Sequence, residues 1–577
     1  MTGEQLAAGS GGNYDVIILG GGLAGLTLGL QLKRARPETT IFIAEKRPGP
    51  APEAAFKVGE STVEVSAHYF AEVVGMKDHI EADQLHKAGL RYFFPAGDNT
   101  DIAERLEWGV PFFPPNPSYQ LDRGRFENEL AKRNLDAGVE LVQGAFIDTV
   151  ELGDDEHSVT IVRGGPGGER TTVRGRWIVD SSGRAFLLKR KLGLEQDNGH
   201  NVNSAWFRLA GGIDIEDWVD ESNTEWFERM KQRGLRRLST NHLMGQGYWV
   251  WLIPLSSGSI SIGIVSDERF HPFEQIETLD GALEWLREHE PQLAAIVDSR
   301  RDGIEDFLRI KDFSYGCKQV YSADRWALTG EAGPFLDPFY SPGSDFIAVG
   351  NTLVTDLVVR DLNGEDVAER TRRHDDLFLR LYKEALTWYE GQYEMWGDPQ
   401  VMIAKIAANN IMYWSTTGLL FFHHKLADTE FMAEVMPEVE RIWALNARLE
   451  ALFLEWFRMV AQEWRHAYVP TVAFPGMGMR HVELTSNFDD QALKAKLTED
   501  SELMEAVAVA IFHKAASFLP EGAPDPETKI NPYAIGLDSD RWEQDGLFKE
   551  PGLAIERAHE LAPGITNLWV DKIAQPA

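Results

Sequence analysis

The sequence is nearly free of cysteine. Cys317 is the only one in 577 residues, so an internal disulfide, a cysteine-based metal site and a thiol redox pair are all excluded. The histidines also lack the spacing and the partner acids that a metal site requires. We therefore expect no metal centre formed by this chain.

Basic residues and long apolar runs are scarce as well. The chain has 57 Lys and Arg residues against 90 Asp and Glu residues, a net charge of −33, and such a surface repels nucleic acid and anionic membranes. No apolar run is long enough to span a bilayer. Residues 1–12 lack the basic and apolar regions of a signal peptide. These absences predict a soluble cytoplasmic enzyme with no nucleic-acid or membrane partner.

The first 45 residues follow the order strand, turn, helix, strand. Tyr14–Leu19 and Thr40–Glu45 are apolar runs, and Gly25–Ala35 between them has helical composition. The segment has the length of a βαβ unit, about 30 residues, with glycines at the first turn. This arrangement is typical of a dinucleotide-binding fold.

The glycines of this turn have separate tasks. Gly20 would permit the tight turn, Gly22 would let the backbone approach a pyrophosphate, and Gly25 would let helix and strand pack closely. The helix N-terminus would then present its unpaired N–H groups to the phosphates. Glu45 ends the second strand, where an acid can bind a ribose hydroxyl. A glycine-rich surface loop is the alternative interpretation.

Two later motifs accompany this turn. Trp249–Pro254 reads W-V-W-L-I-P, and Phe335–Gly343 reads F-L-D-P-F-Y-S-P-G. In this order the three segments resemble the flavin-dependent halogenases, whose marks are G-x-G-x-x-G, W-x-W-x-I-P and F-x-x-P-x-x-S-x-G. The resemblance covers roughly residues 14–350 and implies a FAD-dependent oxidoreductase.

Three further segments favour FAD over NAD. Tyr119–Arg123, Trp177–Arg184 and Trp326–Gly333 resemble the Y-x-x-D-R, D-x-x-G-R and G-D-A elements of FAD monooxygenases. In that family the last element touches the ribityl chain of the flavin. Here Glu331 replaces its usual aspartate. No second dinucleotide fingerprint occurs, so we expect a separate flavin reductase to supply the reduced FAD.

The resemblance implies catalytic roles for three residues. In halogenases, hypohalous acid made from chloride or bromide passes to a lysine that follows a G-E-S/T element, and Lys87 matches that lysine here. Trp249 and Trp251 would lie beside the flavin and keep the substrate away from it. The alternatives are a surface lysine and a pair of packing aromatic residues. Lys57 is the rival lysine, although it precedes its Gly-Glu-Ser element.

The third motif is the expected halide site, at Ser341, Pro342 and Gly343. In the family a chloride is held by the N–H groups of the two residues after the serine, and Pro342 has no N–H group. Tyr340 stands where tryptophan-specific relatives place a glutamate. We therefore expect phenols or pyrroles, rather than free tryptophan, as substrates.

The expected fold is α/β. Residues 1–13 would be a flexible N-terminus, 14–204 and 306–351 a discontinuous FAD-binding Rossmann-like domain of the monooxygenase type, 205–305 a substrate-side β-sheet, and 352–577 a large α-helical C-terminal region. The aromatic stripes of the last region are expected to be core. The cofactor-binding residues implied by the resemblance are Gly20, Gly22, Leu23, Ala24, Gly25, Glu45, Lys46, Gly59, Glu60, Ser61, Arg123, Asp180, Gly330, Glu331, Pro338 and Gly343.

These observations predict a two-component halogenase that uses reduced FAD, O2 and chloride or bromide on an electron-rich aromatic or pyrrole substrate, free or bound to a carrier protein. Two alternatives stay open. One is a FAD monooxygenase or dehydrogenase of the same fold that uses no halide. The other is an inactive flavoprotein scaffold that binds partners through its helical half.

Overall fold

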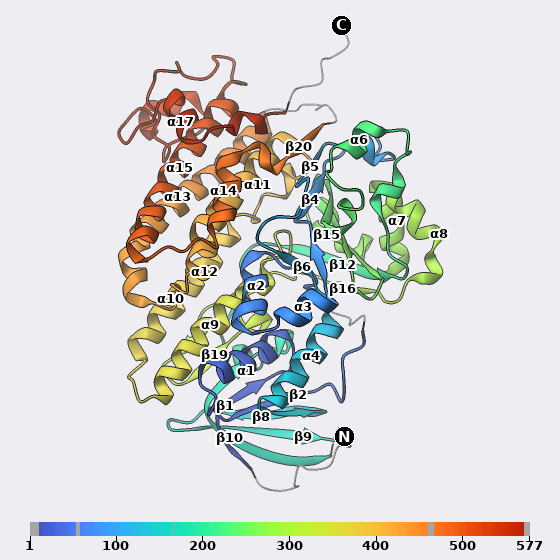
Figure 1. Cartoon of the computed structure of the whole chain (residues 1–577), viewed down its shortest axis with the longest axis vertical. Coiled ribbons are helices and arrows are strands. Elements are labelled where there is room, and N and C mark those ends of the chain that lie inside the picture. The colour runs from blue at the N-terminus through green and yellow to red at the C-terminus, as the bar shows by residue number, and fades with distance from the viewer. Residues whose placement is uncertain (1–10, 54–57, 166, 460–466, 571–577) are drawn as a thin grey trace. The chain divides into compact units, whose positions relative to one another are not determined.

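The computed structural model describes residues 11–53, 58–165, 167–459 and 467–570 (Figure 1). The expected flexible N-terminus falls largely, and Lys57 entirely, outside these residues. The chain forms two compact units. The first comprises residues 1–84, 121–199 and 314–382, and the second comprises residues 85–120, 200–313 and 383–577.

The first unit is built on a mainly parallel sheet in the order β18-β19-β10-β1-β2-β7, with β8 and β9 extending from β10 as antiparallel strands. Both neighbours of β1, which are β2 and β10, run parallel to it. The strands are β1 (Asn13–Leu19), β2 (Ile41–Glu45), β7 (Glu140–Gln143), β8 (Ala145–Glu151), β9 (His157–Arg163), β10 (Glu169–Asp180), β18 (Tyr321–Ser322) and β19 (Trp326–Leu328).

The predicted strand–turn–helix–strand segment is confirmed. β1 is followed by α1 (Leu23–Ala35) and then by β2. Val16–Leu19 are completely buried, because a parallel strand in the middle of a sheet is covered on both faces. Helices α4 (Arg123–Asp136) and α9 (Gly343–Leu362) pack against α1 in the same unit.

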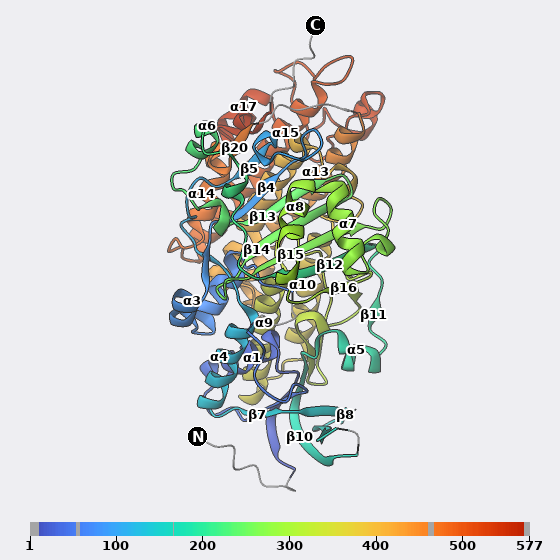
Figure 2. The ribbon, with the colours of Figure 1, turned by 90° about the vertical axis from the view of Figure 1, so that its right-hand side faces the viewer.

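The second unit contains a mixed sheet in the order β16-β12-β15-β14-β13-β4-β5-β20. Helices α7 (Leu279–His289) and α8 (Pro291–Ser299) cover one face of it, where Trp285 and Leu293 join the same apolar core as Val250 (Figure 2). The strands are β4 (Leu90–Phe93), β5 (Glu107–Gly109), β12 (Val202–Leu209), β13 (Thr240–Gly245), β14 (Tyr248–Pro254), β15 (Ile260–Asp267), β16 (Leu308–Ile310) and β20 (Tyr468–Pro470).

This sheet extends beyond the predicted range of residues 205–305. Segment 85–120, expected in the FAD-binding domain, supplies β4 and β5, and the C-terminal region supplies β20. The cause is pairing between segments that are distant in sequence: β4 lies parallel to β13, and β5 pairs with both β4 and β20. No alternation in these three- and four-residue strands marks them as members of a larger sheet.

The C-terminal region is helical, as expected. Its main helices are α10 (Ala368–Leu386), α11 (Pro399–Tyr413), α13 (Thr429–Met459), α14 (Pro475–Glu483), α15 (Asp490–Ala516) and α17 (Ile555–Leu561). Trp443, Phe453 and Trp456, from the aromatic stripe of α13, are buried as core residues. Among the described residues, no helix is long and apolar enough to cross a membrane.

Candidate functional site

The turn between β1 and α1 leaves no room for side chains. Gly20 has φ +112°, and a Cβ atom there would lie 2.6 Å from the carbonyl oxygen of Ser181. A Cβ atom on Gly25 would lie 2.1 Å from the carbonyl oxygen of Gly20. The first turn of α1 therefore sits directly against the ends of β1 and β10, an approach that only glycine permits.

The start of α1 is open to an anion. Gly22 is its N-cap and offers no side-chain cap, and its first turn contains no acidic residue. The unpaired N–H groups of this turn, which begins with the buried residues Leu23 and Ala24, thus keep their capacity to bind phosphate. The residues at this helix start are therefore compatible with the predicted binding of a pyrophosphate.

Glu45 is held at the end of β2 by two backbone groups. Its Oε2 accepts a hydrogen bond from the N–H of Gly21 at 2.8 Å, and its Oε1 accepts one from the N–H of Arg47 at 2.8 Å. The carboxylate is thereby fixed beside the glycine turn, where an acid of a dinucleotide-binding βαβ unit can bind a ribose hydroxyl. Lys46 is exposed at the same strand end.

The late Gly330–Gly333 segment lies against α1. Gly330 has φ +61°, and a Cβ atom there would lie 2.9 Å from the Cβ of Ala24. The buried Asn351 of α9 joins the two parts: it donates to the carbonyl oxygen of Ala24 at 3.0 Å and accepts from the hydroxyl of Thr329 at 2.7 Å. No sequence motif marks Asn351, so this contact could not be predicted.

Glu331 forms an ion pair with Arg184. The Arg184 Nε to Glu331 Oε2 distance is 3.1 Å, and both residues come from motifs that the sequence analysis treated separately. Glu331 is one methylene longer than the aspartate of the family. One of its carboxylate oxygens is therefore engaged by an arginine at the loop predicted to touch the ribityl chain.

Arg123 begins α4 and retains an unused donor. Its Nη1 donates to the carbonyl oxygen of Val58 at 2.8 Å, and its Nη2 donates to Glu127 at 2.6 Å. Its buried Nε has no hydrogen-bond partner among the described residues. A buried donor without a partner is costly, and an anionic cofactor group is the partner that a guanidinium binds best.

The neighbouring cofactor candidates are shaped by the same packing. Gly59 has φ +95°, and a Cβ atom there would lie 2.8 Å from Nη1 of Arg123. The carbonyl oxygen of the buried Glu60 accepts the N–H of Leu121. Asp180 is fully buried, and its carboxylate accepts the N–H groups of Ser182 and Leu188. Burial raises the pKa of this carboxyl group. Its two hydrogen bonds to backbone N–H groups fix the turn that follows β10.

The predicted halide segment meets the Gly-Glu-Ser-Thr segment. Ser341 has the left-handed φ of +59°, which is uncommon for a residue other than glycine and is typical of constrained sites. Its N–H donates to the carbonyl oxygen of Pro338, and its hydroxyl donates to the hydroxyl of Ser61 at 3.0 Å. Two motifs far apart in sequence are thus in contact.

The same segment begins a long helix. Pro342 is the N-cap of α9, and Gly343 is the first helical residue. Asp345 lies in the first turn, and its carboxylate accepts the N–H of Ser66 at 2.8 Å. An acid at this position stabilises the helix N-terminus, and its charge also opposes a bound anion. Asp345 was not among the predicted site residues, although it follows Gly343 by only two residues in the sequence.

In the second unit, Lys87 is completely buried. It ends the short strand β3 (Leu85–Lys87), which pairs with β6 (Ser118–Gln120) so that Lys87 lies opposite Ser118. The alternative of a surface lysine is therefore wrong. Lys87 is therefore an interior residue of this unit, and its catalytic role stays a prediction.

Trp249 and Trp251 point to the same face of β14, as their spacing predicts. Their ring centroids lie 5.7 Å apart, and both residues are buried. The indole N–H of Trp249 donates to the hydroxyl of Tyr393, and that of Trp251 donates to the hydroxyl of Ser261, each at 3.1 Å. Both rings are therefore fixed by hydrogen bonds as well as by packing.

The tryptophans belong to a longer aromatic row. The ring of His242 on β13 lies 5.2 Å from that of Trp249 and stacks on Tyr92 of β4 at 4.7 Å. This row crosses three neighbouring strands, because His242 pairs with both Tyr92 and Trp251 in the sheet register. His242 was not visible as a site residue, because no motif of the sequence marks it.

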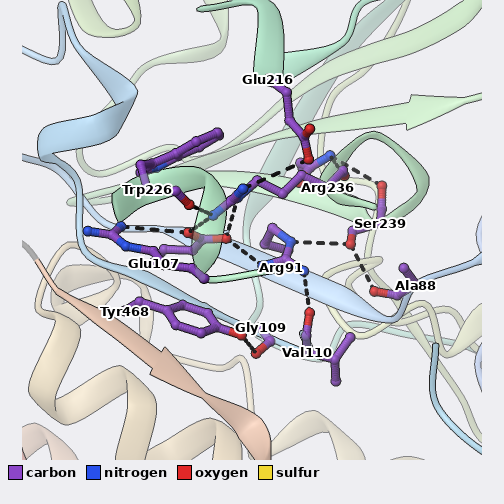
Figure 3. A network of polar contacts seen from close by, with 12 residues as sticks. Ala88, Arg91, Glu107, Gly109, Val110, Glu216, Trp226, Arg236, Ser239 and Tyr468 are labelled. Carbon is purple, nitrogen blue, oxygen red and sulfur yellow. Dashed lines mark hydrogen bonds and ion pairs between the residues drawn. The ribbon is translucent and has the colours of Figure 1, made fainter. Parts of the chain in front are cut away.

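A buried charge network in this unit reaches Ala88, the residue after Lys87 (Figure 3). Glu107, Arg91 and Arg236 are all completely buried, and Glu107 binds both guanidiniums. Burial opposes ionisation of Glu107, but the two arginines hold its pKa below the usual range. Arg91 also donates to the hydroxyl of Ser239, which donates to the carbonyl oxygen of Ala88, the residue after Lys87. The network thus fixes the backbone next to the lysine.

Comparisons with known proteins agree with this geometry. Residues 13–261 match a family described as FAD binding domain. The flavin-dependent halogenase of Dictyostelium discoideum is 30% identical over 394 residues, which cover 63% of this chain and 63% of that protein. Over this part of its length, the chain is similar to a flavin-dependent halogenase. FAD is the cofactor of this fold, and this chain spans only 63% of the length of the amoebal halogenase.

Bacterial halogenases are similar too. A brominase of pyrrole-2-carbonyl groups on a peptidyl carrier protein, from Pseudoalteromonas luteoviolacea, is 26% identical over 61% of this chain and 79% of that protein. The structure of the halogenase PltM in complex with phloroglucinol and FAD has a TM-score of 0.61 and 16% identity, and it covers 86% of this chain and 96% of that chain. The mixed α/β fold with its helical C-terminal region is that of a flavin-dependent halogenase.

The glycine turn gives a first prediction. In Gly25→Ala, the new Cβ meets the carbonyl oxygen of Gly20 at 2.1 Å, and overpacking of this kind costs about 1–3 kcal/mol. We expect the Kd for FAD to rise about tenfold or more, measured by quenching of flavin fluorescence. Gly49→Ala is the control, because nothing lies within 4 Å of its Cβ position. An unchanged Kd in Gly25→Ala would show that the turn does not hold the cofactor.

The charge network gives a second prediction. Glu107→Gln leaves the guanidiniums of Arg91 and Arg236 buried without their carboxylate, and breaking a buried pair costs about 3–5 kcal/mol. We expect the free energy of unfolding to fall by this amount, which lowers the urea concentration at the midpoint of unfolding. Glu228→Gln, an exposed change in the same unit, should leave the midpoint within error. Equal midpoints for the two variants would contradict the structural role of the network.

Proposed function

We propose that this protein is a two-component flavin-dependent halogenase acting on an electron-rich aromatic or pyrrole substrate. One observation carries the proposal: Lys87 is buried in the same unit that holds the tryptophan pair on β14. Both features occur in a chain that is similar to a flavin-dependent halogenase. Bound FAD, reduced by a separate reductase, would supply the oxidising equivalent from O2 to chloride or bromide. Gly20, Gly22, Gly25, Glu45 and Arg123 would hold it.

The proposed task of Lys87 is transfer of the halogen. When its uncharged amine receives the halogen from hypohalous acid, an Nζ–halogen bond forms and water leaves. An aromatic carbon then takes the halogen, the ring loses a proton, and the amine is restored. Complete burial favours this role, because a site closed to bulk water protects a reactive nitrogen–halogen bond from hydrolysis.

The proposed substrate follows from the relatives and from Tyr340. The Pseudoalteromonas enzyme is a brominase of a carrier-bound pyrrole, and the similar enzyme of Pseudomonas fluorescens is a chlorinase of the same carrier-bound group. Tyr340 is buried directly before Ser341 and cannot act as the carboxylate base of the tryptophan-specific branch. A phenol or a carrier-tethered pyrrole, both of which react readily with an electrophilic halogen, suits this site.

A substitution of Lys87 tests the proposal. Lys87→Met keeps the length and burial of the side chain without its amine, and we expect halogenated product to fall by about 100-fold or more. The assay supplies a flavin reductase, bromide or chloride, and a panel of phenols and pyrrolyl thioesters, with detection by mass spectrometry. FAD binding should be unchanged, and Lys231→Met, an exposed change in the same unit, should retain full activity. Wild-type product yield from Lys87→Met would remove the lysine from the mechanism.

A second function, oxygenation or dehydrogenation without halide, is favoured by the start of α9. Pro342 provides no N–H group, and Asp345 places a carboxylate in the first helical turn. Both features weaken a halide site at Ser341–Gly343. If this function holds, the same substrate panel should yield oxygenated or desaturated products, with rates independent of added halide.

Variants of Pro342 distinguish the two functions. Pro342→Ala and Pro342→Ser each restore a backbone donor at the N-cap of α9, and an added hydrogen bond to an anion is worth about 1–3 kcal/mol. In a halogenase, the halide concentration at half-maximal rate should therefore fall about tenfold in both variants. If only Pro342→Ser responds, the hydroxyl and not the backbone binds the halide. Halide-independent product formation by the wild type and both variants would favour the second function.

A further inference from the structure

Lys189 is a buried lysine that no motif marks. It lies in the short helix α5 (Leu187–Lys191) of the first unit, where Arg190 and Lys191 are exposed and Lys189 is only 1% exposed. Its ammonium donates a hydrogen bond to the carbonyl oxygen of Gly333 at 2.7 Å. Gly333 ends the glycine segment that packs on the start of α1.

Two aromatic rings complete the environment of this ammonium. Its Nζ lies 4.7 Å from the ring centroid of Phe186 and 4.2 Å from that of Tyr315, within the range of a cation–π contact. The hydroxyl of Tyr315 donates to the carbonyl oxygen of Glu331 at 2.8 Å. Lys189 therefore contacts the Gly330–Gly333 segment directly and also through Tyr315.

We propose that Lys189 is a positioning residue for FAD, whose ammonium holds the Gly330–Gly333 segment in the shape that binds the cofactor. The inference rests on the assignment of FAD to this fold and not on the halogenation step. The segment is fixed from α1 through Asn351 and Thr329, but its far end, at Gly333, is fixed by Lys189. Loss of the ammonium removes the hydrogen bond to the carbonyl oxygen of Gly333 and weakens the hold on that end.

The position of Lys189 makes FAD binding dependent on pH. Burial lowers its pKa from 10.5 to about 8. An anionic cofactor bound nearby favours the ammonium form and raises this pKa, so FAD affinity is highest below about pH 8 and decreases as the pH rises above it. The charged and titratable groups that face Lys189 from the neighbouring elements are Asp180, Arg184, Glu195, Tyr315 and Cys317.

Titration of FAD onto the cofactor-free protein tests this inference, with the Kd read from flavin fluorescence between about pH 6.5 and about pH 9.5. The wild-type Kd should rise about threefold to tenfold across this range. Lys189→Met should show the weaker Kd at every pH. Lys189→Arg, which keeps the cation and does not titrate here, should keep the tighter Kd at every pH. Lys191→Met should behave as the wild type.

The inference is overturned if Lys189→Met binds FAD as the wild type does at low pH, or if both variants keep the wild-type pH dependence. Thermal unfolding followed by circular dichroism reports whether each FAD-free variant is folded, and Lys189→Arg decides the matter if Lys189→Met is not. The titration uses no halide, O2 or reductase, so absence of halogenation leaves its result intact. A wild type without affinity for FAD would overturn both the cofactor assignment and this inference.

Discussion

The first unit depends on one close approach, that of the first turn of α1 to the ends of β1 and β10. Cβ atoms at Gly20 and Gly25 would each lie under 3.0 Å from backbone oxygen atoms, so the approach exists only because these residues are glycines. Everything else in the candidate cofactor site is arranged around this turn. Glu45 binds its backbone from β2, Gly330 packs against its first residues, and Asn351 ties that contact to α9.

Sequence patterns predicted this turn because its requirements are local. Strand, glycines and helix lie within a short segment, and each glycine has a steric reason that can be stated without knowing its neighbours. Asn351, Tyr315 and Lys189 could not be predicted in the same way. Their roles come from contacts with residues distant in sequence, such as Ala24, Glu331 and Gly333, and a polar residue in a helix or loop carries no signal of such a partner.

The second unit shows the same limit in its sheet. The predicted sheet range of residues 205–305 contains β13, β14 and β15 and most of β12, whereas β4 and β5 lie outside it. Their membership depends on pairing between distant segments and on the Arg91–Glu107–Arg236 network. Buried ions of this kind are expensive to desolvate and are stable only as a complete set. The complete set in turn fixes Ala88, so the placement of Lys87 depends on charges that none of the motifs contains.

The starts of α1 and α9 show how one physical rule leads to opposite expectations. Each helix exposes unpaired N–H groups and the positive end of its dipole at its first turn. At α1 the chain offers glycine and no acid, so the positive end remains for the phosphates of the cofactor. At α9 the chain offers Pro342, which removes a donor, and Asp345, which places a negative charge in the first turn. The second helix start therefore already has its anion in Asp345. A halide bound there must compete with a carboxylate that cannot leave. Ser341 already donates its N–H to Pro338 and its hydroxyl to Ser61, so the backbone N–H of Gly343, the first residue of the helix, is the donor of this segment through which the chain can compensate.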